Sequence, residues 1–260
     1  VHDIAGTADR ASDGCIIAQS NDEIARRAKV IGLSLPTIET NRQVVLEIAK
    51  AGAAGTVVVD TCTIGIDAAK RNAQILNEVG IQYLDSPVSG LKFRAEEGAL
   101  VSMVSGPASE LKKAHKLLEG YSRAIVHVGT EPGQGQRMKV LNNAICIASY
   151  VISSEALTYG EVGGLKVGEM LEVINESSGQ NFATKFLFPK YVATEEYDAS
   201  GAEAHIIEKD ISLFVEGAND EGTPSKAIAA AYDIIKAFND ADPLQDQMNI
   251  YPYVKGLQKG

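Results

Sequence analysis

Cysteine and histidine are scarce in this chain, and neither forms a pattern. The three cysteines, Cys15, Cys62 and Cys146, form no spacing motif, and an odd number gives no disulfide framework. The four histidines lack the i, i+4 pairing that places two metal ligands on one helix face. We therefore expect no structural disulfide and no metal site, and a reducing, cytoplasmic compartment is the simplest expectation.

Basic residues are in deficit, and long apolar runs are missing. Lysine and arginine number 24 against 34 acidic residues, so the net charge is −10, which disfavours a nucleic-acid or anionic-membrane surface. We find no signal peptide, no low-complexity tract, no repeat and no apolar run that we expect to span a bilayer. With 260 residues, 45% of them hydrophobic, the chain suits a compact protein of one large or two smaller domains.

Strand-like and helical segments alternate through the first half of the chain. Short β-branched or apolar runs predict strands, and longer runs with helical periodicity predict helices between them. The predicted strands are 30–35, 56–60, 81–84, 100–105 and 124–128, and the predicted helices are 40–51, 66–79 and 109–118. Such alternation predicts an α/β domain with a largely parallel sheet over residues 1–131, and the β-poor remainder predicts an all-helical domain over 132–260.

A glycine-rich phosphate-binding turn is also absent. Dinucleotide sites use Gly-x-Gly-x-x-Gly between a first strand and helix, so that the backbone approaches the pyrophosphate. Gly133 and Gly135 lack the third glycine and lie beyond the predicted α/β domain, so we do not assign them to such a site.

The segment from Gly133 to Asn143 opens the longest helical run. No breaker occurs from Gln136 to Tyr159, which predicts one long helix. Lys139 and Asn143 stand four residues apart and therefore share one helix face. A proton carrier beside a neutral amide could hold a substrate oxygen; the alternative is an ordinary solvated lysine near a polar patch.

Three motifs in order resemble the β-hydroxyacid dehydrogenase family, which includes the 6-phosphogluconate dehydrogenases. They are Asp85-Ser-Pro-Val-Ser-Gly90, the Gly-x-Gly-x-x-x-Lys-x-x-Asn-Asn run that ends at Asn143, and the Lys209-Asp210 pair. The resemblance covers essentially the whole chain. It implies a Rossmann-type domain followed by a helical substrate and oligomerisation domain, and a homodimer or homotetramer.

The resemblance also implies roles for single residues. Lys139 matches the family's catalytic lysine, and Asn143 matches the amide that holds the substrate oxygen. Ser89 and Gly90 match the loop that binds the substrate carboxylate. The activity implied is hydride transfer between NAD(P) and a small 3-hydroxy acid or its semialdehyde.

The cofactor is expected at the carboxyl edge of the sheet, where the predicted strands end. Leu35 and Pro36 follow one strand and Thr63 follows the next, while Lys209 matches the late lysine that reaches toward the cofactor. Asp3 resembles the end of the family's second strand, where a carboxylate accepts from both ribose hydroxyls and repels a 2′-phosphate. NAD is therefore favoured over NADP.

The substrate loop departs from the family pattern. Leu91 and Arg94 replace glycines, and Ala99 stands where threonine is common. Arg94 could pair with a second acidic group on a substrate, or be a solvated arginine balanced by Glu96 and Glu97. Cys62 replaces a serine, and with no histidine nearby in sequence we do not expect it to be a nucleophile.

On this alignment the family's first strand and glycine turn precede Val1. We expect the natural protein to supply them, and the 260-residue chain alone to bind NAD weakly. Two other functions remain open: a non-catalytic binding protein descended from such enzymes, and an imine reductase, a related class that usually lacks a lysine at the position of Lys139.

Overall fold

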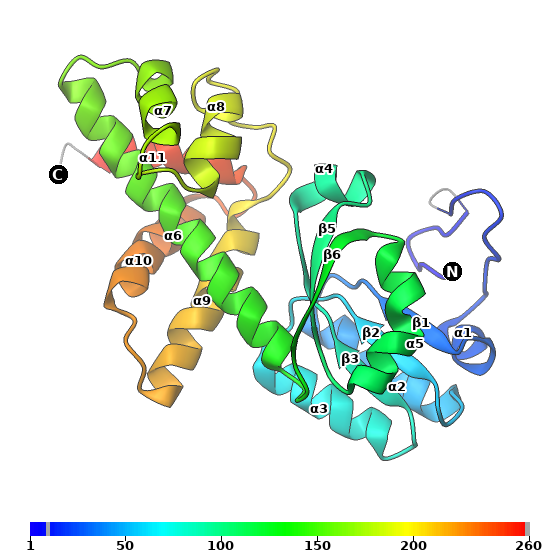
Figure 1. Cartoon of the computed structure of the whole chain (residues 1–260). Coiled ribbons are helices and arrows are strands. Elements are labelled where there is room, and N and C mark those ends of the chain that lie inside the picture. Colours follow the sequence, from blue (N-terminus) through cyan, green and yellow to red (C-terminus); the bar gives the residue numbers. More distant parts are fainter. Residues whose placement is uncertain (9–10, 258–260) are drawn as a thin grey trace. The chain divides into compact units, whose positions relative to one another are not determined.

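The computed structural model describes residues 1–8 and 11–257, and it divides into two compact units, Val1–Lys139 and Val140–Gly260 (Figure 1). The first is an α/β unit and the second is helical. We predicted the domain boundary near residue 131, eight residues before the division between the units. The start of the long helix α6 (Gln134–Val162) is hydrogen-bonded within the first unit, which is why that unit extends to Lys139.

The first unit contains one mixed sheet in which parallel pairing dominates. Strands β1, β2 and β3 are parallel and in register, while β5 is antiparallel to β3 and β4 and parallel to β6. The predicted α/β class is confirmed. The strands are β1 (Val30–Leu33), β2 (Val57–Asp60), β3 (Gln82–Asp85), β4 (Val88–Ser89), β5 (Leu100–Ser105) and β6 (Ser122–Gly129).

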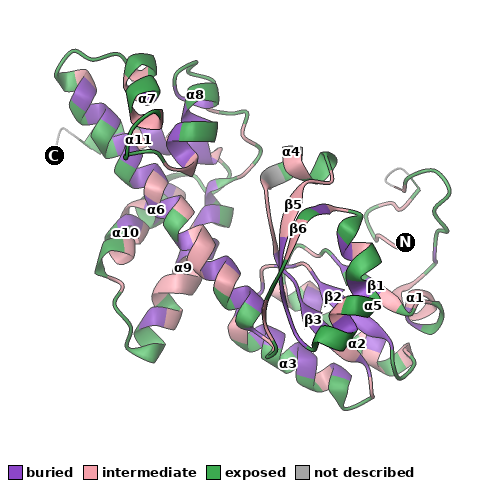
Figure 2. Cartoon of the chain, in the orientation of Figure 1, coloured by how far each residue is buried: buried purple, intermediate pink, exposed green. Residues whose placement is uncertain are grey.

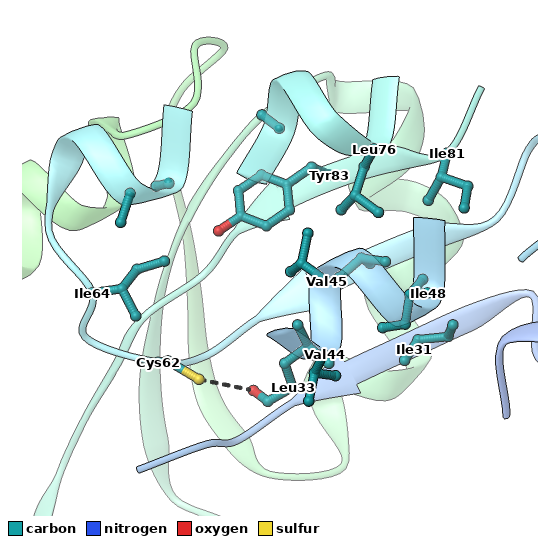
Figure 3. Close-up of a cluster of buried hydrophobic side chains, with 14 of the residues drawn as sticks. Ile31, Leu33, Val44, Val45, Ile48, Cys62, Ile64, Leu76, Ile81 and Tyr83 are labelled. Carbon is teal, nitrogen blue, oxygen red and sulfur yellow. Dashed lines mark hydrogen bonds between the residues drawn. The ribbon is translucent and has the colours of Figure 1, made fainter. Parts of the chain in front are cut away.

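Helices cover both faces of this sheet. The helices of the unit before α6 are α1 (Asn21–Arg27), α2 (Ile38–Ala51), α3 (Ile66–Asn77), α4 (Leu91–Glu96) and α5 (Ala108–Glu119). Side chains of α2 and α3 pack with Val58 on one face (Figure 3), whereas Val57 and Val59 pack with α5 on the other. Successive strand side chains point to opposite faces, so three consecutive valines can be buried in β2 only because both faces are covered.

The second unit is built from helices. Apart from the isolated bridge between Glu203 and Asp246, described residues 140–257 form no strand. After α6 come α7 (Val167–Asn175), a π-helical turn (Ala183–Leu187), α8 (Phe188–Tyr191), α9 (Ala204–Glu221), α10 (Lys226–Ala241), a 3₁₀ turn (Gln247–Asn249) and α11 (Ile250–Gly256). Helices α9 and α10 pack against each other, and each contains buried apolar side chains such as Ile211 and Ile235.

The first residues differ from the expectation of a strand that ends at Asp3. No strand is assigned to residues 1–8. Instead, the Val1 carbonyl accepts from the amide of Ala18, and the Val1 amine donates to the carbonyl of Ile16. The segment therefore makes its hydrogen bonds to a neighbouring loop and not to β1, whose only strand partner among the described residues is β2.

Helix α6 corrects the expectation that no run could cross a bilayer. By length and composition alone α6 is apolar enough to do so, yet half of its most apolar stretch is buried inside the structure, as in the core helix of a globular protein. Figure 2 shows buried and exposed residues alternating along it. The helix runs through Gly160, where a Cβ would displace the flexible side chain of Met170.

Candidate active site

Asp85 is the last residue of β3 and caps the start of α6. Its Oδ2 accepts from the amides of Gly133 at 3.1 Å and Gln136 at 2.9 Å, and from the hydroxyl of Ser105 at 3.2 Å. Oδ1 accepts from Nε2 of Gln136 at 2.7 Å. The first amides of a helix have no partner within it and carry partial positive charge, so a buried carboxylate suits this position.

Gln136 joins the same helix start to the turn that follows β2. Its side chain is fully buried, with Oε1 accepting from the amides of Ile64 at 2.9 Å and Gly65 at 3.1 Å. Nε2 donates to the carbonyl of Cys62 at 2.9 Å and to Asp85. Every polar atom of this side chain is therefore used within the first unit.

Burial and the neighbouring Asp60 carboxylate raise the pKa of Asp85 to about 6, despite the hydrogen bonds from Gln136 and Ser105 that lower it. The folded protein thus holds this proton more tightly than the unfolded chain. The stability that Asp85 contributes is fully present below about pH 4 and is lost as the pH rises through about 6, by at most about 3 kcal/mol.

Chemical denaturation at pH 4 and pH 7 tests this dependence. Relative to Asp85→Asn, the unmodified protein is expected to lose stability between these two pH values. As a control, the Asp13→Asn variant at an exposed position should have the same stability as the unmodified protein at both pH values. A difference between Asp85→Asn and the unmodified protein that stays constant with pH would rule out the linkage.

Lys139 lies one turn after Gln136 on α6 and is only 8% exposed. This burial removes the alternative of an ordinary solvated lysine. Asn143 lies one further turn along the same helix, in the second unit.

Within the second unit, Asn143 belongs to a cluster with the Lys209-Asp210 pair of α9. Its Nδ2 donates to Oδ2 of Asp210 at 2.7 Å, and Nζ of Lys209 lies 2.9 Å from Oδ1 of the same carboxylate. A carboxylate only accepts, so the contact fixes which end of the Asn143 amide is the nitrogen. The sequence assigns Asp210 no role of its own, whereas in the structure it orients the Asn143 amide.

The loop after Asp85 is ordered by pairing and by close packing. Ser89 pairs with Val101 in the antiparallel β4–β5 ladder. Gly90 has φ of +151°, and a Cβ there would lie 2.8 Å from Leu100 and 3.0 Å from the Cβ of Arg94. The Cβ and Cδ of Arg94 thus lie over Gly90.

The turn after β2 contains Cys62 and Thr63. The buried Asp60 accepts from the Asn41 side chain, the Tyr83 hydroxyl and the Cys62 amide. Burial and the Asp60 carboxylate raise the pKa of the Cys62 thiol well above its usual range. The thiol lies beside the carbonyl of Leu33 (Figure 3) and is unsuited to nucleophilic chemistry. Thr63 is half-buried in the same turn.

A cavity of about 530 Å³ runs along β1 and past its carboxyl end. Leu33, Ser34 and Leu35 line it together with Val1 and His2, while Pro36 and Asp3 do not. Oδ1 of Asp3 instead accepts from the amide of Ala5 at 2.8 Å. The volume is within the range of cofactor sites. The lining includes no glycine turn that could hold the diphosphate of a dinucleotide.

Family profiles match both halves of the chain. A profile of the NAD binding domain of 6-phosphogluconate dehydrogenase matches residues 3–129, and a profile of the NAD-binding domain of NADP-dependent 3-hydroxyisobutyrate dehydrogenase matches residues 133–254.

Individual relatives agree with the profiles. The 2-(hydroxymethyl)glutarate dehydrogenase of Eubacterium barkeri is 30% identical over 235 residues, covering 89% of this chain and 77% of that protein. The NAD-dependent L-serine dehydrogenase of Pseudomonas aeruginosa is 34% identical over 184 residues, or 68% of this chain and 61% of that protein.

A solved structure extends the likeness to the fold. The Mycobacterium tuberculosis 3-hydroxyisobutyrate dehydrogenase with L-serine superposes with a TM-score of 0.83 at 26% identity, over 93% of this chain and 84% of that one. These matches in sequence and structure, which span both units, show that the chain belongs to the β-hydroxyacid dehydrogenase family.

Proposed function

We propose that this protein transfers a hydride between NAD and a small 3-hydroxy acid or its semialdehyde, with Lys139 as the general acid and base. The observation that carries the proposal is the buried lysine on α6, one turn before an amide that is held by a carboxylate. When bound, the nicotinamide accepts or supplies the hydride. The protein must bind and orient the alcohol and move its proton.

Lys139 would receive the hydroxyl proton at Nζ as hydride leaves the carbinol carbon, and return it to the carbonyl oxygen in reduction. A lysine can serve in both directions if burial and its neighbours lower the pKa of its ammonium group toward neutrality.

Asn143 would donate to the same substrate oxygen. Asp210 occupies one hydrogen of the Asn143 amide nitrogen, and Nδ2 of Asn142 reaches Oδ1 of Asn143 at 3.2 Å. The second amide hydrogen remains to polarise a carbonyl without adding charge.

Ser89 and Gly90 would bind the substrate carboxylate. A hydroxyl followed by a backbone amide that carries no side chain forms a short anion-binding turn. We assign Leu35, Pro36 and Thr63 to the cofactor because they follow β1 and β2 at the carboxyl edge of the sheet. Lys209, and Asp3 as a ribose partner, complete the proposed cofactor residues, with NAD preferred and NADP accepted less well.

A substrate panel tests the function directly. Hydroxyisobutyrate, L-serine, glycerate and threonate, each with NAD or NADP, would be followed by the absorbance of the reduced nicotinamide. We expect turnover of at least one acid. A thermal-shift titration with both dinucleotides separates this outcome from a non-catalytic relative, which would bind without turnover. A solved imine reductase from Streptomyces aurantiacus shares the fold at 18% identity, but Lys139 favours a hydroxy acid substrate.

We also propose that the protein is a homodimer or homotetramer. A stripe of large apolar side chains on α6 is exposed to solvent. It consists of Ile145, Ile152 and Tyr159, which recur every seven residues and are 62%, 59% and 84% exposed. Ala148, which lies between these positions on α6, is buried within the unit.

Sedimentation velocity checks the oligomer. Ile152→Glu should lower the sedimentation coefficient toward that of a monomer at micromolar concentration, because a charge would lie in an apolar interface. Leu244→Glu is the matched control at another exposed apolar position, 69% exposed. A native protein that sediments as a monomer would refute the proposal.

A further inference from the structure

One hydrogen-bonded connector in the first unit joins three segments that carry proposed active-site residues. Asp85 begins the loop that contains Ser89 and Gly90. Gln136 lies one turn before Lys139 on α6, and its side chain holds the turn that contains Thr63. The two side chains meet directly, through Nε2 of Gln136 and Oδ1 of Asp85 at 2.7 Å.

The side chains of the connector have little room to move. Both side chains are fully buried, and together they satisfy the amides of Gly133, Gln136, Ile64 and Gly65. The hydroxyl of Ser105 supports the carboxylate and also accepts from the amide of Gly135 at 3.0 Å. An unpaired buried amide is unfavourable, so the helix start cannot turn or slide without breaking several of these contacts together.

We propose that Asp85 and Gln136 are positioning residues that fix Lys139 relative to the loop of Ser89 and the turn of Thr63. This inference rests on the proposed function, because Lys139 needs to be held in place only if it transfers a proton to or from the substrate. A proton carrier must reach its substrate oxygen within hydrogen-bond distance. A displacement of about 1 Å can reduce a rate about 100-fold.

Gln136→Leu tests the role, since leucine fills most of the volume and makes none of the hydrogen bonds. The substrate is 3-hydroxyisobutyrate, unlabelled or deuterated at the carbinol carbon, with NAD. We expect kcat to fall about 100-fold and the deuterium isotope effect on kcat to increase, because a misplaced base makes the chemical step limiting. Hydrogen exchange at Ile64, Gly65 and Gln136 should quicken.

Gln247→Leu is the matched control, the same substitution of an amide that is 1% exposed in the second unit and donates to Ser200. It should leave the isotope effect unchanged. If Gln136→Leu does not fold, Ser105→Ala removes one support of Asp85 and should give a loss of roughly threefold to tenfold with the same increase in isotope effect.

The outcomes separate the two claims. Faster exchange at Ile64 and Gly65 with unchanged kcat and isotope effect would overturn the positioning role and leave the proposed function standing. If Lys139→Ala retains full activity in the same assay, the proposed role of Lys139 as acid and base fails. The exchange result would then describe only a structural connector, and the positioning role would fall as well.

Discussion

Lys139→Ala is expected to lower kcat by about three orders of magnitude or more, because it removes both the proton carrier and a group that orients the substrate. Asn143, Asp210 and the substrate loop remain, so the Kd of the hydroxy acid should change little. Steady-state kinetics with the best acid of the panel measure the loss, and circular dichroism checks the fold.

Two variants sharpen this experiment. Lys139→Arg keeps the charge but cannot give up a proton near neutral pH, so it should be nearly as inactive as alanine. Lys166→Ala, at a side chain that is 81% exposed, should have normal kinetics. Lys139→Ala with more than a tenth of the original kcat would show that the lysine is not the acid and base.

Gly135→Ala is expected to destabilise the protein by about 3 kcal/mol, the upper end of the range for an overpacked site. A Cβ there would lie 2.6 Å from the carbonyl oxygen of Met103 and 2.8 Å from that of Asp85. Both obstacles are strand backbone, which cannot rotate away as a side chain would. The helix start must therefore move off the sheet and break the contacts of Gln136.

The helical Gly217 of α9 gives the opposite expectation. No atom lies within 4 Å of a Cβ built there, so Gly217→Ala should stabilise the protein by about 0.5–1 kcal/mol through helix propensity. Urea unfolding measures both variants. If Gly135→Ala and Gly217→Ala both change the free energy of unfolding by a similar, small amount, α6 does not approach the sheet as closely as it does in the structure.

Local patterns were sufficient to predict most of the first unit. The β-branched run at 56–60 predicted β2, and the breaker-free run after Gly135 predicted α6, because each element is encoded in consecutive residues. Helix α1 was missed although its signal is local. Glu23 follows Ser20 by three residues, which is the sequence signature of a capping box. Ser20 Oγ accepts from the amide of Glu23, and the Glu23 side chain accepts from the amide of Gln19, one residue before the cap.

The connector could not be predicted, because it depends on residues far apart in sequence. Asp85 and Gln136 are 51 positions apart, and no spacing rule pairs a strand end with a later helix start. The close packing of Gly133 against α3 and of Gly135 against the sheet likewise appears only in three dimensions. Asp210 was missed for the same reason, since its partner Asn143 is 67 positions earlier.

The most direct test of the central claim is to follow the hydride itself. The protein would be incubated with NAD and 3-hydroxyisobutyrate or L-serine deuterated at the carbinol carbon, and the nicotinamide recovered for mass spectrometry. We predict that deuterium appears on the reduced nicotinamide ring with the native protein and not with Lys139→Ala. No deuterium on the ring with any acid of the panel, from a protein that binds NAD in a thermal-shift titration, would contradict the account.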